Sequence, residues 1–259
     1  MMKKGILLLA PVAIMLMTGC FTVTSGNVSV NNGKDSDAIV KKEIKMASFN
    51  EIEVSQGIKV IVEQGNYPGK VSVATTPSAE KYLCVKVEGE TLKAYYANKA
   101  MSPEKIKGPS IISVSIPELS EADLSSGASI YLDGTFKSNK KMEFDLSSGS
   151  YLNIESLTCG CLSLDVSSGA NVTVENFNGD LDADSSSGSS ISVKEARGGI
   201  FTVDASSGSS ISLKSNQSDE IRASASSGAS VSLSGRTEKL SRHTSSGGSV
   251  KTSDLRNSR

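Results

Sequence analysis

The sequence predicts an all-β protein folded as a single-stranded parallel β-solenoid, or β-helix, with about seven coils of ~20 residues and a β-rich N-terminal cap. The first observation behind this prediction is a Ser-Ser-Gly phrase that occurs seven times, at Gly127, Gly149, Gly169, Gly188, Gly208, Gly228 and Gly247. Successive glycines are 22, 20, 19, 20, 20 and 19 residues apart. A near-constant period of this size indicates stacked units, none of which can bury its apolar face alone.

The second observation is an alternation of apolar and polar residues on both sides of each phrase, which is typical of strands that bury one face. The third residue after each glycine is Ile130, Leu152, Val172, Ile191, Ile211, Val231 or Val250. Equivalent strands of successive coils run in the same direction, so we expect parallel in-register ladders about 4.8 Å apart and a right-handed winding. Each coil should contain a strand, a Ser-Ser-Gly corner, a second strand and a loose connector such as residues 175–179.

Residues 1–19 have the features of a lipoprotein signal peptide. Lys3 and Lys4 precede an apolar stretch at residues 6–17, and Thr18-Gly19-Cys20 follows it. Small residues before a cysteine at this place resemble a bacterial lipobox, in which Cys20 becomes the lipidated first residue. An ordinary secretory peptide with an incidental cysteine is the alternative. Lipidation implies a membrane anchor and a place in the cell envelope, as an outer membrane lipoprotein on either face of that membrane.

Three regions follow the signal peptide. Residues 20–45 are polar and are interpreted as a flexible tether. Residues 46–120 are β-rich, with a helical turn expected at 76–81 and a hairpin at 85–96, and they should cover the first edge of the solenoid. Residues 121–259 hold the repeats and a C-terminal cap, in which basic residues such as Arg242 replace acidic or apolar ones and oppose end-to-end stacking.

The charge balance gives no sign of a nucleic-acid partner. Without Lys3 and Lys4 the chain has 27 − 2 = 25 basic and 28 acidic residues, a net charge of −3. Proteins that bind nucleic acid typically carry a cluster of basic residues on one surface. Adhesion to a protein or a glycan of the host or of the envelope is compatible with this balance.

The three cysteines beyond Cys20 suggest no metal and no cofactor. Cys84 lies in an apparent strand and is interpreted as a small core residue. Cys159 and Cys161 are separated by one residue, which matches neither a zinc-site spacing nor a Cys-x-x-Cys redox motif. Whether these two form a disulfide is left open by the sequence.

An aspartate stands four residues before five of the seven glycines. These residues are Asp123, Asp145, Asp165, Asp184 and Asp204. In a parallel stack they should form one outward column at intervals of about 4.8 Å. The column is either a cation or ligand site, or a solvated face hydrogen-bonded to neighbouring serines. The Gly-Gly-x-Gly-x-Asp repeat of calcium-binding rolls is absent, which favours the second interpretation.

No catalytic residue is predicted. Paired carboxylates on a β-helix are compatible with acid–base chemistry on a polysaccharide, but a catalytic site is one local constellation and this aspartate recurs in coil after coil. The single histidine, His243, lies in the last coil, and the chain has no Gly-x-Ser-x-Gly elbow. Tyr82, Tyr95 and Tyr96 form the one tyrosine cluster of the N-terminal part and are interpreted as core or hairpin residues.

Several motifs resemble the autotransporter-adhesin head domain, called the head GIN domain, which is common in Bacteroidetes. They are the lipobox, the opening at residues 49–54, Gly57-Ile58-Lys59, residues 116–119 and the repeated Ser-Gly-Ala/Ser phrases, and the resemblance spans residues 49–252. Lys59 stands where the Gly-Ile-Asn motif has asparagine. The resemblance implies an adhesin without catalytic residues.

The expected function is therefore a lipid-anchored, non-enzymatic envelope protein that presents a Ser/Asp-rich face for binding. A β-helix enzyme acting on polysaccharide and a structural spacer without a ligand are the alternatives.

Overall fold

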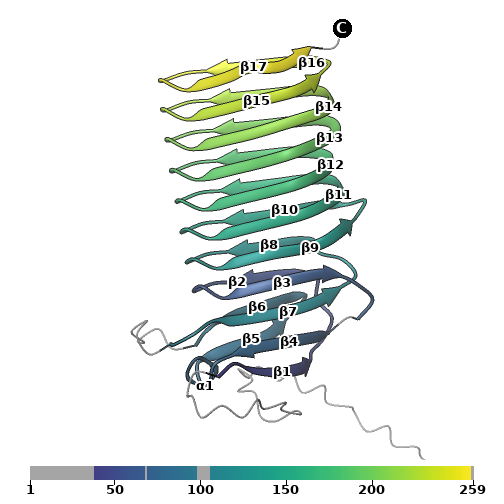
Figure 1. The fold of residues 1–259 in the computed structure, drawn as a ribbon, viewed down its shortest axis with the longest axis vertical. Helices are drawn as coiled ribbons and strands as arrows, with labels where there is room; N and C mark the ends of the chain where they lie inside the picture. The colour runs from purple at the N-terminus through teal and green to yellow at the C-terminus, as the bar shows by residue number, and fades with distance from the viewer. Residues whose placement is uncertain (1–37, 68, 98–105, 258–259) are drawn as a thin grey trace, which may run out of the picture.

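The computed structural model of the protein describes residues 38–67, 69–97 and 106–257. The expected signal peptide, residues 1–19, and the expected lipidation site, Cys20, lie outside the described residues. The chain forms a parallel β-solenoid, as predicted, whose coils stack along one long axis (Figure 1). No helix in the described part of the chain is long and apolar enough to cross a membrane.

The described residues form 17 strands and one short helix. The N-terminal elements are β1 (Val40–Lys45), β2 (Glu51–Val54), β3 (Lys59–Gln64), β4 (Lys70–Thr75), α1 (Pro77–Glu80), β5 (Leu83–Glu88), β6 (Thr91–Tyr96) and β7 (Ser110–Ile116). The repeats supply β8 (Glu121–Leu124), β9 (Ser129–Lys137), β10 (Lys141–Leu146), β11 (Tyr151–Val166), β12 (Asn171–Ser185), β13 (Ser190–Ala205), β14 (Ser210–Ala225), β15 (Ser230–Thr237), β16 (Lys239–Thr244) and β17 (Ser249–Asn257).

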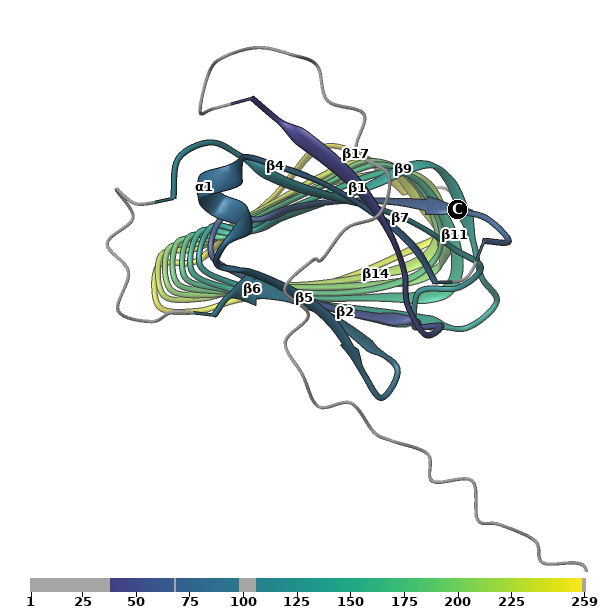
Figure 2. The ribbon, with the colours of Figure 1, turned by 90° about the horizontal axis from the view of Figure 1, so that it is seen from below.

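The coils form a flattened ring with two long walls when the solenoid is viewed along its axis (Figure 2). The wall that precedes each Ser-Ser-Gly corner contains β6, β2, β8, β10, the second halves of β11 to β14, and β16. We call it the acidic face. The wall that follows each corner contains β7, β3, β9, the first halves of β11 to β14, β15 and β17, and we call it the serine face.

Inward-pointing aliphatic residues of successive coils stack directly on one another in the core. Ile191 pairs with Val172 on one side and with Ile211 on the other, and it is 1% exposed. Alternation within each strand leaves polar residues outside, so the period-two prediction from sequence is confirmed.

Each Ser-Ser-Gly corner is a tight turn with two left-handed residues. Ser126 and Gly127 have φ values of 52° and 74°. The N–H of Ala128 donates to the carbonyl of Ser125 at 3.1 Å, and in an equivalent corner the N–H of Ala170 donates to the carbonyl of Ser167 at 3.0 Å. Positive φ at both central residues is the signature of a type I′ turn. The glycine N–H points to the next coil, where Gly127 donates to the carbonyl of Ser148 at 3.0 Å. The corners are thus bonded both within and between coils.

The opposite side of each coil differs from the expected loose connector. Residues 175–179 lie inside the continuous strand β12, and the chain turns there through irregularities in register between Asn178 and Leu181. Phe177 points inward from this segment and is 3% exposed. The interpretation as a loose connector was wrong, because this bend buries its own side chains and keeps its ladder hydrogen bonds.

Glycine is required at this second bend by close backbone packing. A Cβ on Gly198 would lie 1.9 Å from the carbonyl oxygen of Gly179, which is far inside van der Waals contact. In the same way, a Cβ on Gly179 would lie 2.1 Å from the carbonyl oxygen of Cys159. The bends of neighbouring coils therefore approach each other more closely than side chains permit.

The N-terminal cap is built out of sequence order. The coil made by β2 and β3 pairs with β8 and β9 on one side and with β6 and β7 on the other, so later strands lie outside earlier ones. Strand β5 then pairs antiparallel with β6. On the serine face β4 pairs antiparallel with β7, and β1 pairs antiparallel with β4. The antiparallel strands end the parallel stack, which confirms that this region covers the first edge.

Local predictions for the cap hold in part. Helix α1 begins after Thr76, whose side-chain oxygen accepts from the N–H of Ala79, and β5–β6 is the expected hairpin. Cys84 in β5 is buried, as predicted, but it is disulfide-bonded and not simply a small core residue. The tether predicted for residues 20–45 is too long, because residues 40–45 form β1 and pair with β4.

The C-terminal coil departs from the core pattern at Arg242. This residue pairs with Ala223, whose ladder of inward positions continues through Val203, Ala183, Leu164 and Phe144. Arg242 is exposed at the edge of the stack. A charge at an inward position makes this edge a poor template for another coil.

Candidate functional site

The five predicted aspartates lie in one column on the acidic face. Pairing is residue to residue: Asp123 with Asp145, Asp145 with Asp165, Asp165 with Asp184, and Asp184 with Asp204. All point outward, between buried neighbours such as Phe144 and Leu146. The register of the parallel strands alone brings these residues together, since they are about 20 positions apart in sequence.

The column is longer than the sequence analysis proposed. Glu53 of β2 pairs with Asp123 and extends the carboxylates by one coil, and Lys93 of β6 pairs with Glu53. The Lys93 ammonium lies 2.5 Å from the Glu53 carboxylate and ends the acidic run at the N-terminal side. Glu53 stands four residues before Gly57, so the spacing rule could have found it, but Gln56 interrupts the Ser-Ser-Gly phrase there.

At the other end the acidic run stops at a neutral residue. Asp204 pairs with Ser224, and Ser224 pairs with His243 of β16. The single histidine of the chain is therefore in the column but separated from its nearest carboxylate by one coil.

Burial and mutual repulsion both alter the pKa values of the aspartates in the column. Burial first, and then the neighbouring carboxylates, raise the pKa values of Asp123, Asp145 and Asp184 above the ordinary aspartate value. For Asp145 the main charged neighbour is Asp165, and for Asp184 it is Asp204. Ionised carboxylates stacked in this way destabilise one another and attract positive charge.

The serines expected as hydrogen-bond partners do not bond to the aspartates of the column. Within the described residues, no hydroxyl donates to any of the five aspartates, and the corner serines bond the backbone, as Ser189 does with the carbonyl of Val166 at 2.7 Å. The serines instead form one side of a shallow groove of about 430 Å³ along the column. Its lining residues are Glu53, Ser55, Asp123, Leu124, Ser125, Asp145, Leu146, Ser147, Asp165 and Ser167.

A second acidic column lies beside the aspartates on this face. Glu121 lies beside Asp123 and is in register with Glu51 and Glu143. One carboxylate oxygen each from Glu121, Asp123 and Asp145 lies within 4.8 Å of the others, so this trio could hold a cation. Oxygen ligands of this kind suit Ca²⁺ or Mg²⁺. The two aspartates are exposed, and exposed carboxylates remain well solvated without an ion.

The remaining candidate residues have structural surroundings. Tyr96 is buried, with its hydroxyl donating to Ser110 at 2.9 Å, and Tyr82 packs against the core from its edge. Tyr95 lies on the hairpin, where the Lys86 ammonium is 5.5 Å from its ring centroid. These positions agree with the interpretation as core and hairpin residues.

Cys159 and Cys161 are both free thiols. Cys159 is buried, and burial raises its pKa to about 12, which makes the reactive thiolate scarce. The disulfide that the sequence left open is absent between these two residues.

The fold and the column together define an elongated β-solenoid repeat protein whose coils present the same outward side chain at each level. The chain belongs to the family described as "Putative auto-transporter adhesin, head GIN domain", whose model matches residues 48–218 and 181–259. The resemblance proposed from the motifs is confirmed.

Solved structures of similar fold come from Bacteroides and Parabacteroides species. A "putative adhesin" from Bacteroides fragilis is 16% identical with a TM-score of 0.70, and the match covers 83% of this chain and 96% of that one. A "putative adhesin" and a "Putative lipid binding protein" from Parabacteroides distasonis are 18% and 17% identical, with TM-scores of 0.65 and 0.66. These matches cover 83% and 82% of this chain and 97% and 96% of the other chains. None of the curated proteins matches this chain significantly in sequence.

Proposed function

We propose that the protein is a non-enzymatic adhesin of the cell envelope, anchored as an outer membrane lipoprotein through Cys20, that binds a protein or glycan partner along its solenoid. The observation that carries this proposal is the in-register repetition of outward side chains. Each coil from Asp123 to Asp204 offers one carboxylate in the same place, which suits contact with an extended partner.

The same repetition argues against an enzyme acting on polysaccharide. Hydrolysis of a glycosidic bond needs one carboxylic acid and one carboxylate with different environments. The pKa values of Asp123, Asp145 and Asp184 are shifted in the same direction, with burial as the leading cause for each. These three shifts therefore do not divide the three aspartates into an acid and a base.

The envelope location rests on the N-terminal sequence and on the family description. Cys20 follows a signal-peptide pattern, and only 17 residues separate it from the first described residue at position 38. Two or more acyl chains on this cysteine would hold the domain at a membrane surface, since each buried methylene contributes about 0.8 kcal/mol.

Surface display in a non-adherent bacterial host tests both halves of the proposal. Cells that carry the full chain should adhere to immobilised matrix proteins or glycans more strongly than cells with an empty vector. Cys20→Ala should move the protein from the membrane fraction to the soluble fraction and abolish adherence. Equal adherence of vector and full-chain cells would refute the adhesin proposal, and membrane retention of the Cys20→Ala variant would refute lipidation at this residue.

A further inference from the structure

A groove on the serine face of the cap, next to Tyr67, lies well away from the aspartate column. Tyr67 is 70% exposed, the largest exposure of any large apolar or aromatic residue in the described part of the chain. Two hollows of about 560 and 340 Å³ flank it, and both are lined by Tyr67, Glu43 and Lys70. Volumes of this size are within the range of roughly 300–1,000 Å³ typical of small-molecule sites.

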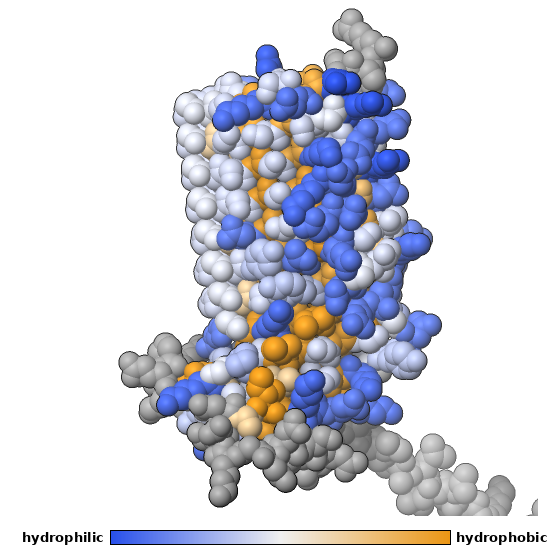
Figure 3. Space-filling view, in the orientation of Figure 1, coloured by the Kyte–Doolittle hydropathy of each residue, from blue (hydrophilic) through white to orange (hydrophobic). Residues whose placement is uncertain are grey.

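The floor of the smaller hollow contains short serine side chains on two neighbouring strands, β4 and β7. Ser72 of β4 pairs with Ser113 of β7, and Ser113 pairs with Ile61 of β3. Ser115 and Glu63 form the next row. Because serines are short and the residues around them are long, the sheet surface is hollowed at this point. Apolar residues also gather on this lower part of the serine face (Figure 3).

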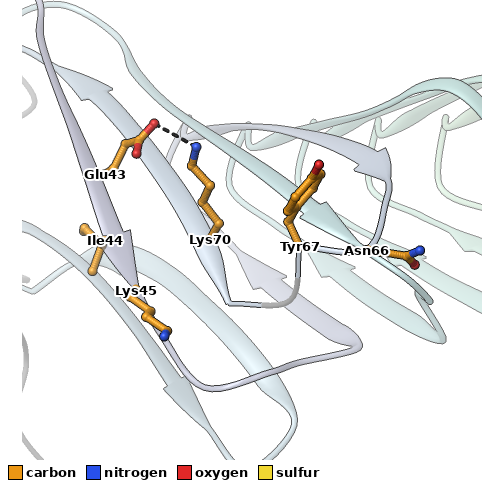
Figure 4. A pocket seen from close by; sticks show the side chains of 6 residues that line it. All are labelled: Glu43, Ile44, Lys45, Asn66, Tyr67 and Lys70. Atoms are coloured by element: carbon orange, nitrogen blue, oxygen red, sulfur yellow. Dashed lines mark ion pairs between the residues drawn. The ribbon is translucent and has the colours of Figure 1, made fainter.

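The rim is built from Tyr67 and an ion pair. The Lys70 ammonium lies 3.1 Å from the Glu43 carboxylate, and Lys70 lies between Glu43 and Tyr67 (Figure 4). Asn66 and Lys45 line the larger hollow on the other side. The charged groups of the two hollows are Glu43, Glu63, Lys45 and Lys70, whose formal charges sum to zero.

Close packing and backbone hydrogen bonds fix Gly65 and Gly69, which lie two residues before and after Tyr67. A Cβ on Gly65 would lie 2.3 Å from the Ser115 hydroxyl, and one on Gly69 would lie 2.2 Å from the carbonyl of Met46. The N–H of Gly65 donates to Ile116 at 2.9 Å, and Gly69 accepts from Met46 at 2.8 Å. Gly65 and Gly69 are thus bonded to the end of β7 and to Met46, the residue after β1.

We infer that this Tyr67 groove is a binding site for a neutral oligosaccharide. An exposed aromatic face attracts the weakly positive C–H bonds of a pyranose ring, since the face of the ring carries negative charge. Hydroxyl, amide and paired charged groups around it can exchange hydrogen bonds with sugar hydroxyls. A site with no net charge favours a neutral sugar over a uronic acid. Hollows on both sides of Tyr67 match a chain of several sugar units.

This inference rests on the proposed adhesin function, for which it names a ligand class and a site. The chain has no tryptophan, so Tyr67→Trp creates a single fluorescent reporter in the groove. Titration with neutral hexose and N-acetylhexosamine tetrasaccharides should change the fluorescence of this variant and saturate. A uronic acid tetrasaccharide of the same length should bind at least tenfold more weakly.

Calorimetry on other variants locates the site. Tyr67→Ala should lose at least tenfold in affinity and Tyr67→Phe should stay within about threefold of the parent, because the ring and not the hydroxyl makes the contact. Ser113→Tyr should fill the floor and block binding. Tyr151→Ala, which removes a tyrosine elsewhere on the serine face, is the matched control and should bind normally. Unchanged melting temperatures would show that the variants are folded.

The inference is overturned if the parent binds none of the neutral tetrasaccharides, if Tyr67→Ala binds as well as the parent, or if the uronic acid probe binds best. The adherence assay separates this failure from failure of the proposed function. Adherence without tetrasaccharide binding would support the adhesin function and refute the oligosaccharide site at the groove. Tetrasaccharide binding without adherence would support the site and refute the adhesin function.

Discussion

Arg242 lies directly beside Ala223 in the ladder of inward positions, at the last coil of the solenoid. Every earlier member of this ladder from Phe144 to Ala223 is apolar and buried, and Arg242 alone carries a charge. The exposed edge of β16 and β17 would otherwise offer a further coil both unpaired backbone groups and an apolar core.

Replacing this arginine should therefore promote end-to-end association. Arg242→Leu should increase the fraction of dimers or larger species in sedimentation velocity, at equal protein concentration. Lys251→Leu is the matched control: it removes a positive charge from the same coil at an outward position, in register with Ser232, and should associate less. Equal association of the two variants would show that net charge, and not the inward arginine, protects the edge.

The core ladder can be tested in the middle coil. Ile191→Asp places a carboxylate between Val172 and Ile211 without a partner, which should cost several kcal/mol in the free energy of unfolding. Ser192→Asp introduces the same group at the next residue, which points outward, and should cost about 0.5 kcal/mol or less. Urea denaturation of both variants measures the difference. Similar midpoints would contradict the assignment of inward and outward positions.

Substitution of Gly188 in a Ser-Ser-Gly corner and of Gly198 in the second bend should lower stability for different reasons. A Cβ on Gly188 would meet no atom within 4 Å, so Gly188→Ala should cost only the left-handed backbone at φ 72°, about 1–2 kcal/mol. Gly198→Ala would bring a Cβ against the backbone of Gly179 and should cost more. Thermal denaturation ranks the two. A larger loss of stability for Gly188→Ala than for Gly198→Ala would contradict the close backbone packing at the second bend.

The aspartate column should make stability depend on pH. Folding raises the pKa values of Asp123, Asp145 and Asp184, so the folded state holds these protons more tightly than the unfolded state. Their destabilising effect is absent below the unfolded-state pKa, develops as pH rises through the folded-state pKa, and is complete above it. The triple Asn variant carries Asp123→Asn, Asp145→Asn and Asp184→Asn. Its stability relative to the parent should increase as the pH rises from acidic to neutral, and added salt should shrink the difference.

The same variant distinguishes repulsion from cation binding. If the column is a solvated face, the triple Asn variant melts at or above the parent temperature at pH 7, and neither Ca²⁺ nor chelator changes the parent. If the trio around Asp123 holds a cation, Ca²⁺ raises the parent melting temperature by mass action and the variant loses this response. We expect the first result. A calcium-dependent shift that the substitutions abolish would make the acidic face a metal site.

The sequence was sufficient for the repeated part of the fold because each coil carries its own signals. A period near 20 gave the coils, alternation gave the inward residues, and the spacing from Asp123 to Gly127 placed the aspartates in one column. Helix α1 and the β5–β6 hairpin were also predictable, since a Thr-Pro start and a Gly89 turn are local features. Local patterns suffice where each unit repeats the geometry of the last.

Only the tertiary structure decided what depends on pairing between distant segments. The β2–β3 coil lies between β6–β7 and β8–β9, which no local pattern encodes, because strand order is set by hydrogen bonds between segments far apart in sequence. That order adds Glu53 and Lys93 to the aspartate column. It also bonds Gly65 to the end of β7 and Gly69 to Met46, next to the groove that Tyr67 lines on the serine face.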